Sequence, residues 1–167
     1  QLIARRLREL NVYCEIHPYN KLPELNSSIK GIILSGSPFS VRDALAPVIE
    51  LNTLFQKLPV LGLCYGAQLM AHKSGGEVAP SKIREYGRAH LTISNTSHVL
   101  FQNIPANSQV WMSHADTIVS LPDEFEITAS TTDVKVAAFH SKSKPVFGFQ
   151  FHPEVYHSTE GKRMIAN

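Results

Sequence analysis

The chain has 167 residues, of which 43% are hydrophobic and 18% are charged, a composition that excludes an intrinsically disordered protein. Its formal net charge of +2 gives no argument for a nucleic-acid partner. No apolar run approaches the roughly 20 residues of a membrane-spanning helix, and no signal peptide opens the chain, so no membrane partner is expected.

The first half of the sequence alternates between helix-like and strand-like segments. A helical period of apolar residues is found at residues 1–10, 44–56 and 65–76. Strand-like apolar runs are found at residues 11–18, 30–38 and 59–63. This alternation predicts parallel strands that are covered by helices.

The second half has short strand-like runs with few helices between them. These runs are found at residues 89–94, 109–114, 125–131, 135–141 and 145–152. A helical tail follows at residues 157–167. We therefore expect an α/β fold with a mostly parallel central sheet, flanking helices and additional short antiparallel strands in the second half. We expect one domain over residues 1–167, and because a helix opens it, we expect the natural protein to have a strand before it.

A glycine-flanked cysteine joins the strand at residues 59–63 to the next helix, in the sequence GLCYG. This is the cysteine form of the G-x-S-x-G nucleophile elbow, in which side chains in place of the glycines would clash at a sharp turn. The turn puts Cys64 at a helix N-terminus, which favours the thiolate, and directs the amide of Tyr65 at a developing oxyanion. We predict that Cys64 is a nucleophile; the alternative is a small buried apolar residue.

A thiolate nucleophile needs a base, and the base needs an orienting group. The sequence FQFHPEV offers His152 and Glu154 two residues apart, and an extended backbone, which Pro153 favours, places both on one side. Glu154 can then accept a hydrogen bond from one ring nitrogen of His152 and leave the other for Cys64. The alternative is a surface His–Glu pair.

The remaining cysteine and histidines carry weaker signals. Cys14 has no flanking glycines and is interpreted as structural. With only two cysteines the sequence has no disulfide framework, which favours a reduced, cytoplasmic setting. No CxxC or HExxH spacing gathers the histidines, so no metal site is predicted.

Three motifs together indicate a family: the glycine turn ILSGSP at residues 33–38, the cysteine elbow, and the His-x-Glu segment. In this order, and over essentially the whole chain, they resemble the class I (triad-type) glutamine amidotransferase family. GLCYGAQLMA and FQFHPEV are its two most specific signatures. The sequences VWMSHAD (residues 110–116) and REYGRAHL (residues 84–91) resemble the glutaminase domains of the GMP synthase branch.

The resemblance implies an activity and a partner. A domain of this family hydrolyses glutamine to glutamate and ammonia through a cysteine thioester and needs no cofactor of its own. The ammonia would pass to an ATP-pyrophosphatase synthetase domain, in the same or another chain, that converts XMP to GMP with ATP and Mg²⁺. Alternatives are the glutaminase domain of a different class I amidotransferase, a DJ-1-like or peptidase-like cysteine hydrolase, and a non-catalytic module with a decayed site.

The resemblance also implies roles for particular residues. Cys64 is the nucleophile, His152 the base and acid, and Glu154 the orienting group. The oxyanion donors are the amides of Tyr65 and of the turn Gly36-Ser37-Pro38, where the family commonly has Gly-Gly-Pro. A backbone N–H survives this change, so the oxyanion hole is expected to persist, and the open question is whether Ser37 can take the backbone angles that a glycine would. The residues implied to hold the substrate are Gln68 through its side chain, and Ser113 and His114 through their backbone.

A charged segment, PSKIREYGRAH, lies between the elbow helix and the later strands. It contains Lys82, Arg84, Glu85 and Arg88. We interpret it either as a solvated loop or as a docking surface for the synthetase domain, since Arg and Tyr commonly anchor interfaces.

Overall fold

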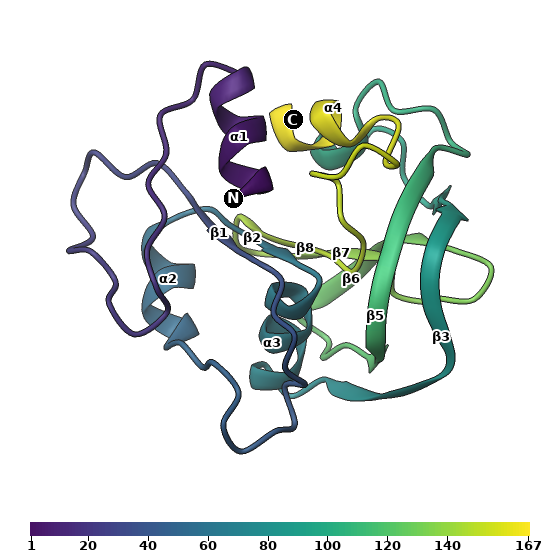
Figure 1. The fold of residues 1–167 in the computed structure, drawn as a ribbon, viewed down its shortest axis with the longest axis horizontal. Helices are drawn as coiled ribbons and strands as arrows, with labels where there is room; N and C mark the ends of the chain where they lie inside the picture. Colours follow the sequence, from purple (N-terminus) through teal and green to yellow (C-terminus); the bar gives the residue numbers. More distant parts are fainter.

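A six-stranded mixed sheet forms the centre of the computed structural model, which describes residues 1–167 except for the side chains of residues 82–85 (Figure 1). Its strand order is β1-β2-β8-β7-β6-β4. The parallel part consists of β1 (Ile32–Leu34), β2 (Val60–Leu63) and β8 (Val146–Phe149). The antiparallel part adds β7 (Ala138–Ser141), β6 (Phe125–Ser130) and β4 (Thr92–Ile93). The expected α/β fold with antiparallel strands from the second half is confirmed.

Helices cover both faces of this sheet (Figure 1). On one side lie α1 (Leu2–Glu9) and α4 (Gly161–Ala166), which contact each other. On the other side lie α2 (Leu51–Lys57) and α3 (Tyr65–Lys73). A short 3₁₀ helix, η1 (Val99–Phe101), contacts α4. No helix among the described residues is both long enough and apolar enough to span a membrane.

The strand β2 shows why both faces of the sheet are buried. Its side chains alternate, so Val60 packs with the residues of α2 and α3, whereas Leu61 and Leu63 pack with residues of α4 and η1. A strand that is covered on both faces needs apolar residues at every position, which is what PVLGL supplies. The carboxyl end of β2 is therefore held rigidly, and Cys64 follows it directly.

A separate antiparallel ribbon of β3 (Glu77–His90) and β5 (Gln109–Ser120) stands beside the main sheet (Figure 1). The sequence pattern predicted the start of β5 but no strand over residues 77–88. The charged segment in β3 was interpreted as a loop or a docking surface, and the side chains of Lys82, Arg84 and Glu85 lie outside the described part of the chain. A charged ribbon strand has too few apolar residues to be recognised from its period alone.

Two predicted elements differ from the structure. Residues 11–18 are not a strand, because no strand of the described chain pairs with them, and Val12, Tyr13 and Ile16 are exposed. The helix predicted at residues 44–56 begins only at Leu51, where the Glu50 side chain caps it by accepting a hydrogen bond from the Asn52 amide. Pro47 disfavours helical angles in Ala46, so a helix cannot run unbroken from residue 44.

Candidate active site

The turn between β2 and α3 places Cys64 at the base of a pocket. Cys64 is the residue before the first turn of α3 and has backbone angles of φ 51° and ψ −105°. A positive φ is unfavourable for a non-glycine residue, and such strain persists only where the surroundings enforce it. The Cys64 amide donates a 2.7 Å hydrogen bond to the carbonyl of Phe149 in β8, which fixes the turn to the sheet.

The two glycines that flank Cys64 are required by close packing. A Cβ at Gly66 would lie 2.3 Å from the carbonyl oxygen of Leu34, and a Cβ at Gly62 would lie 2.7 Å from the backbone of Gly66. Both distances are shorter than real Cβ contacts. The steric reason given for the elbow from the sequence is therefore confirmed, with β1 as a second neighbour that the sequence could not reveal.

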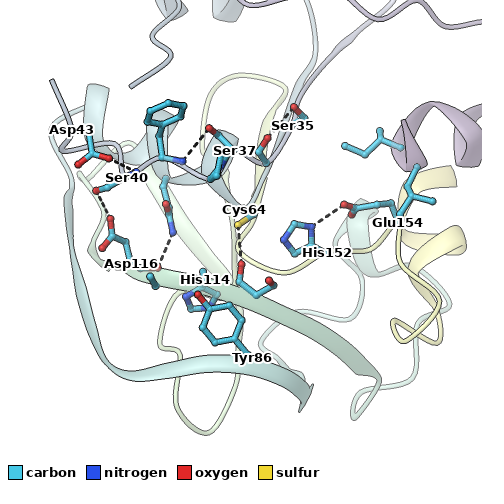
Figure 2. A pocket seen from close by; sticks show the side chains of 18 of the residues that line it. Ser35, Ser37, Ser40, Asp43, Cys64, Tyr86, His114, Asp116, His152 and Glu154 are labelled. Carbon is cyan, nitrogen blue, oxygen red and sulfur yellow. Dashed lines mark hydrogen bonds and ion pairs between the residues drawn. The ribbon is translucent and has the colours of Figure 1, made fainter. Parts of the chain in front are cut away.

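His152 and Glu154 follow β8 and lie beside Cys64 (Figure 2). The Nδ1 atom of His152 is 2.8 Å from the Glu154 carboxylate, and the imidazole ring lies next to the Cys64 side chain (Figure 2). Both side chains are largely buried, with 18% and 9% of their surface exposed. The second oxygen of Glu154 is buried without a hydrogen-bond partner in the described part of the chain, so the carboxylate acts through His152 alone there.

These contacts change the charge state of His152. Burial lowers its pKa, but the hydrogen bonds to Cys64 and Glu154 and the charges of both groups outweigh burial and raise the pKa to about 10. His152 is therefore an imidazolium at neutral pH, and both of its ring nitrogens can donate. An imidazolium beside a cysteine stabilises the thiolate form that attacks a carbonyl carbon.

The backbone around His152 is anchored to β5. The His152 amide donates to the carbonyl of Trp111 at 2.9 Å, and the Ser158 hydroxyl donates to the carbonyl of His152 at 2.6 Å. From the other side, Arg6 of α1 donates to the carbonyl of Glu154 at 2.9 Å. No role was predicted for Arg6 or Ser158 from the sequence, because neither belongs to a recognisable motif.

The glycine turn lies directly above the nucleophile. A Cβ at Gly36 would be 3.3 Å from Cε1 of His152 and 3.8 Å from Cβ of Cys64, so the turn passes close to both. Among the described non-glycine residues, positive φ occurs at Asn11, Cys64 and Asn103, and Ser37 is not one of them. Ser37 therefore has backbone angles that any residue can adopt, and the Ser37 amide remains available as a hydrogen-bond donor.

The pocket has a volume of about 880 Å³, within the range of small-molecule sites. It is lined by all the residues predicted for substrate or oxyanion binding except Tyr65, whose side chain is buried in the core. The Cys64 thiol lies 3.7 Å from the carbonyl oxygen of Ser113, which places that carbonyl next to the reactive sulfur. His114 is buried, and burial, its largest influence, lowers its pKa, so its ring is neutral at neutral pH.

Gln68 lies one turn after Cys64 on α3 and lines the pocket, as predicted. Its side-chain nitrogen donates to the carbonyl of Asp116 at 2.8 Å and to the side chain of Gln150 at 3.2 Å. These bonds occupy the amide nitrogen and hold the side chain in one orientation. Gln68 therefore connects α3 to β5 in addition to facing the pocket.

Asp116 is a pocket residue for which no role was predicted from the sequence. Its carboxylate accepts hydrogen bonds from the Ser40 hydroxyl and, at 3.1 Å, from Arg42 (Figure 2). The sequence did contain a signal, because Asp116 follows His114 by two residues on β5 and both are buried on the same face. A buried carboxylate requires partners, but the sequence does not show which residues supply them.

The whole chain matches a known protein family. The family model "Glutamine amidotransferase class-I" matches residues 1–167. The chain is 62% identical over all its 167 residues to a glutamine-hydrolysing GMP synthase of Cytophaga hutchinsonii, and 57% identical to that of Christiangramia forsetii. It spans 33% of the length of each of these curated relatives.

Solved structures show the same fold. A Thermoplasma acidophilum protein, provisionally assigned as part of a GMP synthase, matches with a TM-score of 0.84 and 31% identity, over 99% of this chain and 84% of the other. A glutamine amidotransferase of Thermotoga maritima matches with a TM-score of 0.75 and 21% identity, over 99% and 75% of the two chains. At 21% identity the second similarity shows the fold alone.

Proposed function

Because the chain belongs to the class I glutamine amidotransferase family, we propose that it releases ammonia from glutamine for a synthetase that makes GMP. The observation that carries this proposal is the arrangement of Cys64, His152 and Glu154 in one pocket, with the Ser113 carbonyl beside the sulfur. The relatives that match the chain are named as glutamine-hydrolysing GMP synthases, which supports both the substrate and the product.

The first half of the reaction forms a thioester. The thiolate of Cys64 attacks the side-chain amide carbon of glutamine, and the amides of Ser37 and Tyr65 stabilise the resulting oxyanion. Loss of one such donor typically costs about 3–4 kcal/mol of transition-state stabilisation. His152, an imidazolium at neutral pH, then donates its proton to the departing nitrogen, and ammonia leaves.

The second half returns the enzyme to its starting state. His152, now neutral, takes a proton from a water molecule, which attacks the γ-glutamyl thioester of Cys64. The products are glutamate and the regenerated thiolate–imidazolium pair. Glu154 keeps the ring of His152 oriented and stabilises its charge throughout.

The synthetase partner would use the ammonia before it reaches bulk water, where protonation removes its nucleophilicity. ATP and Mg²⁺ would bind to that partner, which would convert XMP to GMP, and no cofactor is needed by the residues described here.

Both cysteines are free thiols in the structure. A reduced, cytoplasmic setting is proposed because the mechanism requires the thiol of Cys64.

A direct experiment separates this function from the cysteine-hydrolase alternative. The protein is incubated with free glutamine and, separately, with an unstructured peptide, and release of glutamate, ammonia and peptide fragments is measured. Glutamate and ammonia in equal amounts, without peptide cleavage, are expected. Peptide cleavage without glutamate release would favour the alternative.

We also expect that the glutaminase activity depends on the partner. Tyr86 lines the pocket and is 62% exposed on β3, so it lies at the mouth, where a docked domain would contact it. Activity should be low for the chain alone and should rise when a synthetase domain loaded with XMP and ATP is added, because the partner binds the competent state better. The measurement is glutamate release with and without the partner.

The variant Tyr86→Ala should blunt this rise by about tenfold if Tyr86 anchors the interface. Tyr13→Ala is the matched control, since Tyr13 is also exposed, at 84%, and does not line the pocket. Full activity without any synthetase domain, unchanged by its addition, would refute the dependence.

A further inference from the structure

Asp116 joins three parts of the pocket. Its carboxylate accepts hydrogen bonds from Ser40 and Arg42 in the loop after β1, and its backbone carbonyl accepts one from Gln68 of α3. Asp116 itself belongs to β5, the strand that carries Ser113 and His114. One residue therefore connects the loop, the ribbon and the elbow helix.

The loop that Asp116 holds also carries the predicted oxyanion donor. Ser37 lies three residues before Ser40, and residues 40–43 form a compact turn. In this turn the Ser40 amide donates to the Asp43 carboxylate at 2.9 Å, and the Asp43 amide donates to the Ser40 carbonyl at 3.1 Å. Ser37 is linked to this turn, because the Phe39 amide donates to the Ser37 hydroxyl at 3.3 Å and Phe39 directly precedes Ser40. Contacts at Ser40 and Arg42 therefore also restrain the backbone of Ser37.

The buried charge of Asp116 favours the position of the loop in which Ser40 and Arg42 contact it. The side chain of Asp116 is 9% exposed, whereas that of Arg42 is 44% exposed. A buried carboxylate is strongly disfavoured unless it is paired, because it has lost its water. If the loop moved away from β5, the Asp116 carboxylate would lose its hydrogen bonds to Ser40 and Arg42, so the paired position of the loop is favoured.

In the view of Figure 2, Asp116 and Ser40 lie on one side of Cys64, and His152 and Glu154 lie on the other. The proton-transfer residues thus hold one side of the nucleophile, and the Asp116 contacts hold the other. Because the hydrogen bonds of Asp116 and those of the His152–Glu154 pair involve different residues, the two sets can be tested separately.

On this basis we propose that Asp116 is a positioning residue that holds the Ser37 amide over Cys64 by binding Ser40 and Arg42. The proposal rests on the proposed glutaminase function and adds a residue to it. In this role Asp116 takes no part in the nucleophilic attack or in proton transfer. It acts through the loop, and a displacement of a donor by about 1 Å is enough to lower a rate about 100-fold.

The test uses Asp116→Asn in the natural protein that contains residues 1–167, with its synthetase present. Asparagine keeps the shape and one acceptor but loses the charge that binds Arg42. We expect kcat for glutamine hydrolysis to fall by about 10- to 100-fold, as for a misplaced oxyanion donor. The KM for glutamine should change little, because Gln68, Ser113 and His114 remain in place.

A second readout distinguishes positioning from general damage. Iodoacetamide alkylates a thiolate without forming an oxyanion, so its rate at Cys64 should be unchanged in Asp116→Asn. Arg42→Gln should lower kcat in the same direction, and the double variant should be no slower than the slower single variant, because both changes break one contact. Asp133→Asn, at an exposed loop position, is the matched control and should behave as wild type.

The outcomes are separable. An unchanged kcat in Asp116→Asn, or a parallel loss of kcat, iodoacetamide reactivity and melting temperature, would overturn the positioning role. If the wild type releases no ammonia from glutamine, the proposed function fails instead. In that case the role of Asp116 is decided by a ratio of two labelling rates at Cys64, that of the glutamine analogue diazo-oxo-norleucine divided by that of iodoacetamide. A lower ratio in Asp116→Asn than in the wild type supports the positioning role. An equal ratio overturns it. If Asp116→Asn does not fold, Arg42→Gln tests the same contact.

Discussion

Replacing Cys64 with alanine is expected to lower glutamine hydrolysis by about 10⁶-fold, the loss seen when a protease nucleophile is removed. Alanine keeps the Cβ and the backbone of the elbow, so the fold and the pocket should remain. The only other cysteine of the sequence, Cys14, does not line the pocket and donates to the carbonyl of Ala4 in α1, so it is not placed to replace Cys64. The measurement is glutamate release under saturating glutamine, together with the melting temperature.

A covalent label provides the control for this result. Diazo-oxo-norleucine should add one adduct to the wild type, on the peptide that contains Cys64, and none to Cys64→Ala. Cys14→Ala should keep both the label and the activity. Persistent glutaminase activity in Cys64→Ala, or labelling of Cys14 alone, would show that the elbow is not the reactive centre.

The pair of His152 and Glu154 should give the second large effect. Removing His152 as His152→Ala should cost about 10⁶-fold in kcat, whereas Glu154→Gln should cost about 10⁴-fold, because an orienting group contributes less than the group that transfers the proton. Glutamine at residue 154 can still hydrogen-bond the ring but no longer stabilises its positive charge. Equal losses in the two variants, with unchanged melting, would indicate that Glu154 has a direct chemical role.

The charge state of His152 gives a measurable signature of the same pair. Its pKa is raised to about 10 in the folded protein, from 6.5 for an unperturbed histidine. A raised pKa means that the pair stabilises the fold fully below about pH 6.5 and that this stabilisation is lost as the pH rises through about 10. In Glu154→Gln the NMR titration of the His152 ring should move to lower pH, and the alkaline loss of stability should begin earlier. An unchanged titration would contradict the assigned contact.

The elbow could be predicted from the sequence because its requirements are local. Gly62, Cys64 and Gly66 meet within one turn, and the chemistry of the turn follows from their spacing. The contact between His152 and Glu154 was predicted from an extended segment, in which residues i and i+2 share a side. In the structure the strand ends at Phe149 and Glu154 lies in a turn, yet the two side chains still meet at 2.8 Å. His152 and Glu154 meet Cys64 because β2 and β8 are neighbours in the sheet. From the sequence, only the family resemblance implied this meeting.

The residues that were missed act over long distances. Arg42 and Asp116 are 74 residues apart, and Arg6 reaches the carbonyl of Glu154 across 148 residues. No local pattern encodes such contacts, because they depend on how the ribbon of β3 and β5 stands beside the sheet. The same reason explains the strand predicted at residues 11–18, whose alternating side chains satisfy a strand pattern but have no pairing strand in the described structure.

The proposed hydrolysis of glutamine proceeds through a γ-glutamyl thioester on Cys64. Its most direct test is acid quenching of the protein during turnover of glutamine, with the synthetase present, followed by mass spectrometry of the intact chain and its peptides. We expect an added mass of one γ-glutamyl group on the peptide that contains Cys64, which hydroxylamine removes and which Cys64→Ala lacks. Continued glutamate release with no such adduct at any quench time, or an adduct on a different residue, would contradict it.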